Sequence, residues 1–239
     1  MLPAAYYPID LFDCQSMDWQ VVGGAVEGGR SLASDTPDRL PLGRGGLWKC
    51  EMSSVFLETP EEYSAWRAIR AKLRNGAGRI VVPVLRRPWF AQPGPSSPVS
   101  HSDGSFFSDG AGYQSAAIVA ELVQGAAHAA TLIRVKVAGA EPFIGAEPFT
   151  IVHPNAAERL YEVAGISEAT PSGNGVIYSL EINPPLREAA PAGTAVDFDR
   201  PRCVMRLTDA NGMNYDEEIV SFPSVSLIED LRALRGDVE

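Results

Sequence analysis

The sequence predicts a mainly β protein with a single α-helix. Several short segments alternate apolar and polar residues, which is the period of a half-buried strand. Glycine and proline are frequent, 22 and 19 of 239 residues, and this favours many turns. Only residues 59–76 combine helical apolar spacing with capping residues at both ends.

The N-terminal region contains two segments with strand periodicity. Met17, Trp19 and Val21 alternate with polar residues, and residues 48–56 show the clearest alternation in the chain. Between them, residues 23–46 are rich in glycine, serine, aspartate and proline. That composition predicts a loop.

The helix is predicted from local signals. Thr59 is a suitable N-cap, Pro60 suits the first helical position, and Glu62 at the third position closes a capping box. Asn75-Gly76 supplies a left-handed C-cap. One apolar stripe runs along the helix: Tyr63, Trp66, Ile69 and Leu73.

Beyond the helix, residues 79–85 form a nearly continuous apolar strand in which Pro83 predicts an edge or a strand end. Residues 86–113 are predicted to form a long loop. Its paired aromatics, Phe106 and Phe107, favour contact with a partner. Residues 116–201 contain about five short strands, enough for a small barrel or sandwich.

The C-terminal region is predicted to form a hairpin. Cys203, Met205 and Leu207 alternate with polar or smaller residues, and residues 209–212 end in Asn-Gly, a common hairpin turn. A return strand is therefore expected over residues 214–222. The last apolar segment, from Ser224, is expected to form a strand or a short helix.

Charge and cysteine content exclude several classes. The net charge is -10 and the pI is about 4.8, which disfavours a surface that grips nucleic acid. No apolar run approaches the ~20 residues that span a bilayer, and no signal peptide is expected. Cys14, Cys50 and Cys203 are too scattered for a disulfide framework or zinc ribbon. Cys50 and Cys203 are expected in the core.

The sequence reveals no catalytic, cofactor-binding or metal-binding residues. No P-loop, nucleophile elbow or metalloprotease pattern occurs. His101, His128 and His153 lack the spacing of a metal site. We therefore expect no enzyme activity and no cofactor.

The strongest local charge feature is basic: Arg67, Arg70, Arg74, Arg79, Arg86 and Arg87. One interpretation is compensation of the helix dipole at its C-terminal end. The other is a subunit contact that meets an acidic patch on a neighbour. Its candidate residues are Arg67, Arg70 and Arg74 around an apolar centre of Trp66, Trp89 and Phe90.

Taken in order, these features resemble the distal tail proteins of long-tailed bacteriophages and prophages. The most telling segments are WRAIR at 66–70, IVVPV at 80–84, SFFSDG at 105–110 and PPLRE at 184–188. The resemblance covers almost the whole chain. It implies a split β-barrel related to tail-tube proteins, interrupted by an inserted small β-barrel or sandwich domain.

The resemblance also implies organisation and partners. Residues 1–92 and 203–239 would form the ring-forming domain, 93–115 a linker and 116–202 the inserted domain. The chain would form a ring, usually of six copies, at the tail tip of the virion after synthesis in the host cytoplasm. Its partners would be the tail tube and the hub or baseplate proteins, with no membrane.

Physical arguments agree with a ring. An open barrel has unpaired edges that neighbouring subunits can join, and a closed ring arises from head-to-tail contacts. The negative charge suits a channel through which DNA passes unbound. We expect the acidic residues of such a channel around Asp216, Glu217 and Glu218.

Three alternatives remain open. In the first, the inserted domain would be a carbohydrate-binding module, with Phe106, Phe107 and Tyr113 stacking on sugars. In the second, the chain would be another tail component, such as a tube terminator or hub protein. In the third, it would be an enzyme, such as a cell-wall hydrolase, whose aspartate or glutamate groups no sequence motif reveals.

Overall fold

The computed structural model describes residues 5–30, 37–43, 45–85, 90–94, 98–99, 105, 108, 113–114, 118–210, 212–216 and 219–232. The protein is mainly β with one α-helix among these residues, as the sequence predicted. It forms two compact units. The first comprises Met1–Leu85, Val152–Leu160 and Arg202–Glu239, and the second comprises Arg86–Ile151 and Tyr161–Pro201. Val152–Leu160, which the sequence placed in the insert, thus belongs to the first unit.

The first unit is built on a six-stranded sheet in the order β1-β6-β15-β16-β5-β2. Neighbouring strands run antiparallel, except for the parallel pair β1 and β6. Pro83 is the last residue of β6, a strand end as predicted. The strands are β1 (Ala5–Tyr6), β2 (Cys14–Val22), β5 (Leu47–Val55), β6 (Ile80–Pro83), β15 (Arg202–Leu207) and β16 (Val225–Glu229).

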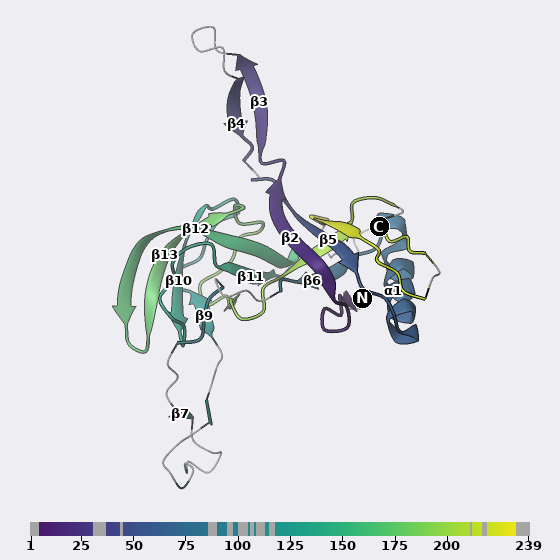
Figure 1. Cartoon of the computed structure of the whole chain (residues 1–239). Coiled ribbons are helices and arrows are strands. Elements are labelled where there is room, and N and C mark those ends of the chain that lie inside the picture. Colours follow the sequence, from purple (N-terminus) through teal and green to yellow (C-terminus); the bar gives the residue numbers. More distant parts are fainter. Residues whose placement is uncertain are drawn as a thin grey trace. The chain divides into compact units, whose positions relative to one another are not determined.

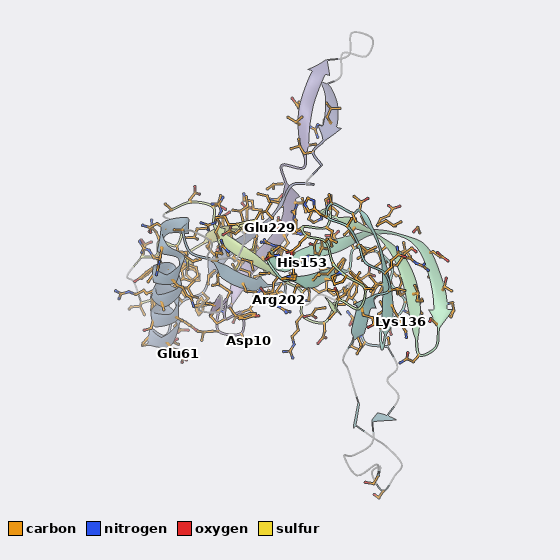
Figure 2. The ribbon with its side chains drawn as sticks, turned by 180° about the vertical axis from the view of Figure 1, so that it is seen from behind. Asp10, Glu61, Lys136, His153, Arg202 and Glu229 are labelled. Carbon is orange, nitrogen blue, oxygen red and sulfur yellow. The ribbon has the colours of Figure 1, made fainter. Side chains whose placement is uncertain are left out.

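Helix α1 (Pro60–Leu73) packs on one face of this sheet. The predicted capping box is present: Glu62 N donates to Thr59 Oγ1 at 3.3 Å, and Thr59 N donates to Glu62 Oε2 at 2.9 Å. The backbone N–H groups of Glu58 and Thr59 donate to the Glu62 carboxyl and lower its pKa. Trp66 and the other buried helix residues join Cys50 and Met52 of β5 in one core. Glu61 marks the first turn of the helix in Figure 2.

The helix ends in a left-handed turn that begins earlier than predicted. Arg74 has φ 44°, Asn75 has φ 55° and Gly76 has φ 91°. The three residues form a short 3-10 turn, η1 (Arg74–Gly76). Left-handed backbone is unfavourable for most residues with a Cβ but is tolerated by asparagine, so the strain of this turn lies mainly at Arg74.

The segment predicted as a loop contains a β-hairpin. Strands β3 (Ala25–Arg30) and β4 (Pro37–Pro41) pair antiparallel and extend beyond the ends of β2 and β5 (Figure 1). At the base of the hairpin, two backbone segments approach each other closely, and a Cβ on Gly46 would lie 2.5 Å from Val22 O. Glycine is therefore required there. The prediction missed this hairpin because its strands lack apolar alternation.

The predicted return strand over 214–222 is wrong. Among the described residues of that segment, only Ser221 makes a bridge, to Leu57. Strand β15 instead pairs with β16, the last apolar segment, with Leu207 opposite Leu227. The turn after β15 does form, since Gly212 N donates to Asp209 O at 3.1 Å.

The second sheet has six strands in the order β14-β11-β12-β13-β10-β9. They are β9 (Val119–Leu122), β10 (Leu132–Ala138), β11 (Pro148–His153), β12 (Ala157–Ser172), β13 (Gly175–Asn183) and β14 (Val196–Asp197). Within the second unit, an aromatic cluster fills the core, with Phe149 within 5.0 Å of Phe198 and 5.5 Å of Tyr161 between ring centroids. Lys136 marks β10 in Figure 2.

This second sheet closes almost completely into a barrel. Leu122 N donates to Thr194 O at 2.9 Å, and Gly193 N donates to Leu122 O at 2.8 Å. These bonds join β9 to the residues just before β14, so the two ends of the sheet meet. A separate short pair, β7 (Pro98–Val99) and β8 (Tyr113–Gln114), lies within the region predicted as a loop. No helix in the described part of the chain has the length and apolar character needed to cross a membrane.

Candidate functional site

Three arginines predicted for a subunit contact line one surface pocket. Arg67, Arg70 and Arg74 each directly follow a buried residue of α1, so they project along the flank of the helix and are exposed. The pocket has a volume of about 570 Å³, and Asn75 and Tyr215 complete its polar lining. None of the described acidic residues lines it. We call it the basic pocket.

The basic pocket has the chemistry of an anion site. Guanidinium groups bind carboxylates or phosphates through paired, directional hydrogen bonds. The left-handed turn at Arg74 and Asn75 places both residues at the pocket wall. Tyr215 comes from a segment more than 130 residues away in the sequence, so sequence reasoning missed it. No local pattern connects Tyr215 to the helix.

Trp66 does not lie on this surface, which corrects its assignment as an interface residue. Its side chain is 0% exposed, and its Nε1 donates to Met213 O at 3.2 Å. Its ring packs edge-on against Phe12, with centroids 5.7 Å apart. Trp66 therefore anchors the helix to the core of the first unit.

The remaining predicted contact residues give less support. Phe90 is buried, with 8% exposure, and so offers little area to a partner. Trp89, Phe106 and Phe107 lie outside the described residues, as does the side chain of Tyr113. Their predicted contacts, including stacking on sugars, stay predictions.

The second feature of the first unit is an open sheet edge. Strand β2 is nine residues long and pairs only with β5 among the described strands. Its sequence, CQSMDWQVV, contains no proline, lysine or arginine. Such residues commonly protect an edge against further pairing. The edge of β2 is therefore competent to pair with another strand.

An acidic groove lies beside that edge, on the sheet face opposite the helix. Its volume is about 540 Å³, and its charged lining residues are Asp18, Glu51 and Asp209. Asp18 and Glu51 stand directly opposite each other on β2 and β5. Four serines line the groove as well: Ser16, Ser53, Ser224 and Ser226. We call this surface the acidic groove.

The expected acidic residues around 216–218 are only partly described. Asp216 is exposed, whereas Glu217 and Glu218 lie outside the described residues. The acidic groove is instead formed by residues from β2, β5 and the turn after β15. Sequence distance does not reveal which acidic residues gather on one face, so this site was not predicted.

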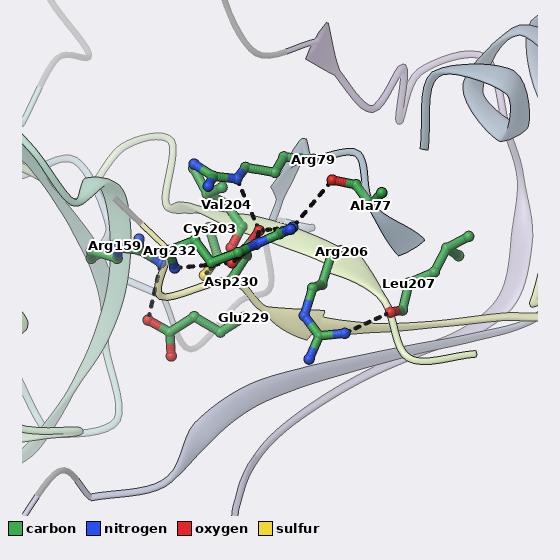
Figure 3. Close-up of polar contacts among 10 residues, drawn as sticks. All are labelled: Ala77, Arg79, Arg159, Cys203, Val204, Arg206, Leu207, Glu229, Asp230 and Arg232. Carbon is green, nitrogen blue, oxygen red and sulfur yellow. Dashed lines mark hydrogen bonds and ion pairs between the residues drawn. The ribbon is translucent and has the colours of Figure 1, made fainter. Parts of the chain in front are cut away.

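A cluster of ion pairs lies within the first unit at the end of β16 (Figure 3). Asp230 Oδ2 lies 2.9 Å from Arg79 Nε and 2.5 Å from Arg232 Nη2. Burial opposes ionisation of Asp230, but the hydrogen bonds from Arg232 and the charges of Arg79 and Arg232 outweigh it and lower its pKa. An aspartate held ionised in this way is a poor general base.

Glu229 and Arg159 form a neighbouring pair that is fully buried. Arg159 Nη1 lies 3.6 Å from Glu229 Oε1, and Trp48 N donates to Glu229 Oε2 at 3.2 Å. Both side chains are 1% exposed or less. A shallow pocket of about 330 Å³ lies beside Glu229 and Asp230. The contacts of both carboxylates are those of a structural cluster.

Cysteine and histidine chemistry gives no competing site in the described part of the chain. Cys50 and Cys203 are both 0% exposed, in agreement with their predicted place in the core. Burial raises the pKa of the Cys50 thiol well above its ordinary value, and nearby Cys14 raises it further. No group of three or more potential metal ligands occurs among the described residues.

Comparison with known proteins adds no assignment. No protein-family model matches the chain, and no curated protein shows significant sequence similarity to it.

Proposed function

We propose that this protein is a structural subunit of a bacteriophage tail tip. Copies of the chain form a ring that joins the tail tube to the hub or baseplate proteins and surrounds the DNA channel. The DNA passes as unbound cargo. In this role the protein is located in the virion, acts without a cofactor and is not an enzyme.

The observation that carries this proposal is the open edge of the first sheet. The nine-residue strand β2 has one neighbour, β5, in the described part of the protein. A long unprotected edge favours aggregation unless another strand covers it. In a ring, each copy presents its edge to the next, and closure leaves no edge exposed.

Exposed apolar side chains of the first unit also support assembly. On the β3–β4 hairpin, Val26 is 50% exposed and its partner Leu40 is 53% exposed. Leu42 follows at the base of the same hairpin and is also exposed. Apolar side chains grouped on a protruding element are typical of contact surfaces. A neighbouring subunit or tail-tube protein would cover them.

The net charge of -10 suits the passage of DNA. Like charge prevents the phosphate backbone from adhering to a wall. The sequence segments that resemble distal tail proteins, including WRAIR at 66–70, support the same role. A tube terminator or a hub protein would share the open edge, and the position of the chain in the particle distinguishes these roles.

The test is assembly of the purified full chain. Light scattering coupled to size exclusion should give a closed oligomer, and negative-stain images should show rings. Mixing with tail-tube protein should place those rings at the tube end. A chain that stays monomeric at every concentration and ignores tube protein would contradict the proposal.

A further inference from the structure

The basic pocket has no counter-charge among the described residues, unlike three other arginines of the first unit. Arg79, Arg159 and Arg232 each face a carboxylate. Arg67, Arg70 and Arg74 form no ion pair with a described residue, although the protein carries a net charge of -10. Asp216, next to Tyr215 of the pocket wall, forms no ion pair with them either. Three exposed guanidinium groups are therefore available to an external anion.

The acidic groove has the opposite excess. Asp18 and Asp209 form no ion pair with a described residue, and Glu51 reaches only Lys49, at 2.5 Å. Asp18 lies directly opposite Glu51 across the two strands. Like charges in directly opposite positions destabilise a strand pair. A cation from outside the chain would relieve this repulsion.

The charged groups of the two surfaces lie on different faces of the sheet, although the adjacent residues Asn214 and Tyr215 line the groove and the pocket respectively. Cys50 and Met52 point into the core that the helix covers. Glu51 and Ser53 alternate with them and therefore lie on the opposite face of β5. The basic pocket lies along the helix flank, on the covered side of the sheet. Within one chain, none of the three arginines forms an ion pair with an acidic residue of the groove, so we consider their pairing between two copies.

We propose that the basic pocket of one copy binds the acidic groove of the next copy. Arg67, Arg70 and Arg74 would meet Asp18, Glu51 and Asp209 in a head-to-tail contact. Because the groove includes Ser16 and Asp18 of β2, the same approach brings the open edge to the neighbouring subunit. The inference rests on the proposed self-assembly and names the surfaces that join.

Charge reversal tests this pairing. Arg70→Glu should weaken self-association by about tenfold or more, as loss of a close interfacial charge pair does. Lys72→Glu is the matched control, because Lys72 is exposed on the same helix but does not line the pocket. Asp18→Arg should weaken association similarly, and its control is Glu121→Arg at an exposed position of the second unit. Circular dichroism and thermal unfolding verify that each variant folds.

Mixing the variants provides the decisive result. Neither Arg70→Glu nor Asp18→Arg should assemble well alone, but their equimolar mixture should recover assembly, because each restores an opposite-charge pair for the other. Sedimentation velocity measures all combinations. Recovery supports the proposed contact.

The opposite outcomes separate two failures. If the unmodified chain forms rings and neither reversal weakens them, the pocket–groove contact is wrong and the ring function stands. If Arg70→Glu weakens assembly but Asp18→Arg does not, the pocket binds a different acidic surface and the pairing is overturned. If the unmodified chain never self-associates, both the contact and the ring fail.

Discussion

The two sheets of this protein have the same number of strands but differ in whether their edge strands are paired. The second sheet joins β9 to the residues before β14 through two backbone hydrogen bonds, of 2.9 and 2.8 Å, and so nearly closes. The first sheet ends at β1, two residues long, and β2, nine residues long. Its long edge lies open among the described residues.

The closed sheet needs no partner to satisfy its backbone hydrogen bonds, whereas the open sheet does. A closed sheet satisfies its backbone groups internally, whereas an open edge leaves a row of donors and acceptors for another chain. The first unit also carries the basic pocket, the acidic groove and the hairpin with exposed Val26 and Leu40. Assembly is therefore expected to involve the first unit.

The largest expected effect comes from removing one core aromatic from each unit. Trp66→Ala and Phe149→Ala each delete a fully buried ring, which should cost about 3 to 5 kcal/mol. Because each unit has its own core, each substitution should lower mainly the stability of its own unit. Hydrogen exchange measured at increasing urea concentrations distinguishes the unfolding of the first unit from that of the second. Equal loss of protection in both units from either variant would show that they unfold as one.

A smaller effect is expected from Asp230→Asn in the first unit. The aspartate accepts charge-assisted hydrogen bonds from Arg232 and pairs with Arg79, and bonds to charged groups contribute about 1.5 to 3 kcal/mol. Since the pKa of Asp230 is lower in the folded protein, its stabilisation is present above its ordinary pKa of 3.8 and is lost as pH falls through the folded value. The destabilisation by Asp230→Asn should be full at neutral pH and shrink in strong acid, as measured by urea unfolding at several pH values. A pH-independent difference would contradict this role of the charge.

The smallest effect, and the opposite pH response, is expected in the second unit. Burial raises the pKa of the Glu162 carboxyl, and the charge of Glu147 raises it further. A raised carboxyl pKa favours the folded state below its ordinary value of 4.5, and this advantage is lost as pH rises through the folded value. Glu162→Gln should therefore stabilise the second unit slightly at neutral pH. Thermal unfolding of the Glu162→Gln variant at pH 4 and pH 7 measures this effect, with Glu168→Gln at an exposed position as the control. A loss of stability of the Glu162→Gln variant at neutral pH would refute the prediction.

Local signals were sufficient to predict the helix and several strands. Thr59, Pro60 and Glu62 lie within four residues of one another, so their capping interactions depend on little else. The alternation around Cys50 likewise identified the buried face of β5. The apolar stripe of the helix predicted that Trp66 is buried. The additional prediction that Trp66 lies at a subunit interface conflicts with that burial.

Features that depend on distant residues were not predicted. Strand β15 shows clear alternation, but its sequence does not reveal that β16 is its partner. The hairpin strand β3 contains two glycines and little apolar alternation, so its pairing with β4 has no periodic signal. The basic pocket needed Tyr215 beside α1, and the acidic groove needed Asp18 opposite Glu51. Both arise from tertiary packing and strand register.

Amide hydrogen exchange at the two sheet margins tests most directly whether the open edge is completed by another copy. In dilute monomer, outward-facing amides of β2 should exchange rapidly, while those that join β9 to Gly193 and Thr194 should be protected. On assembly, the β2 amides should become protected and those of β9 should remain unchanged. Unchanged rapid exchange of β2 in fully assembled particles would contradict the account.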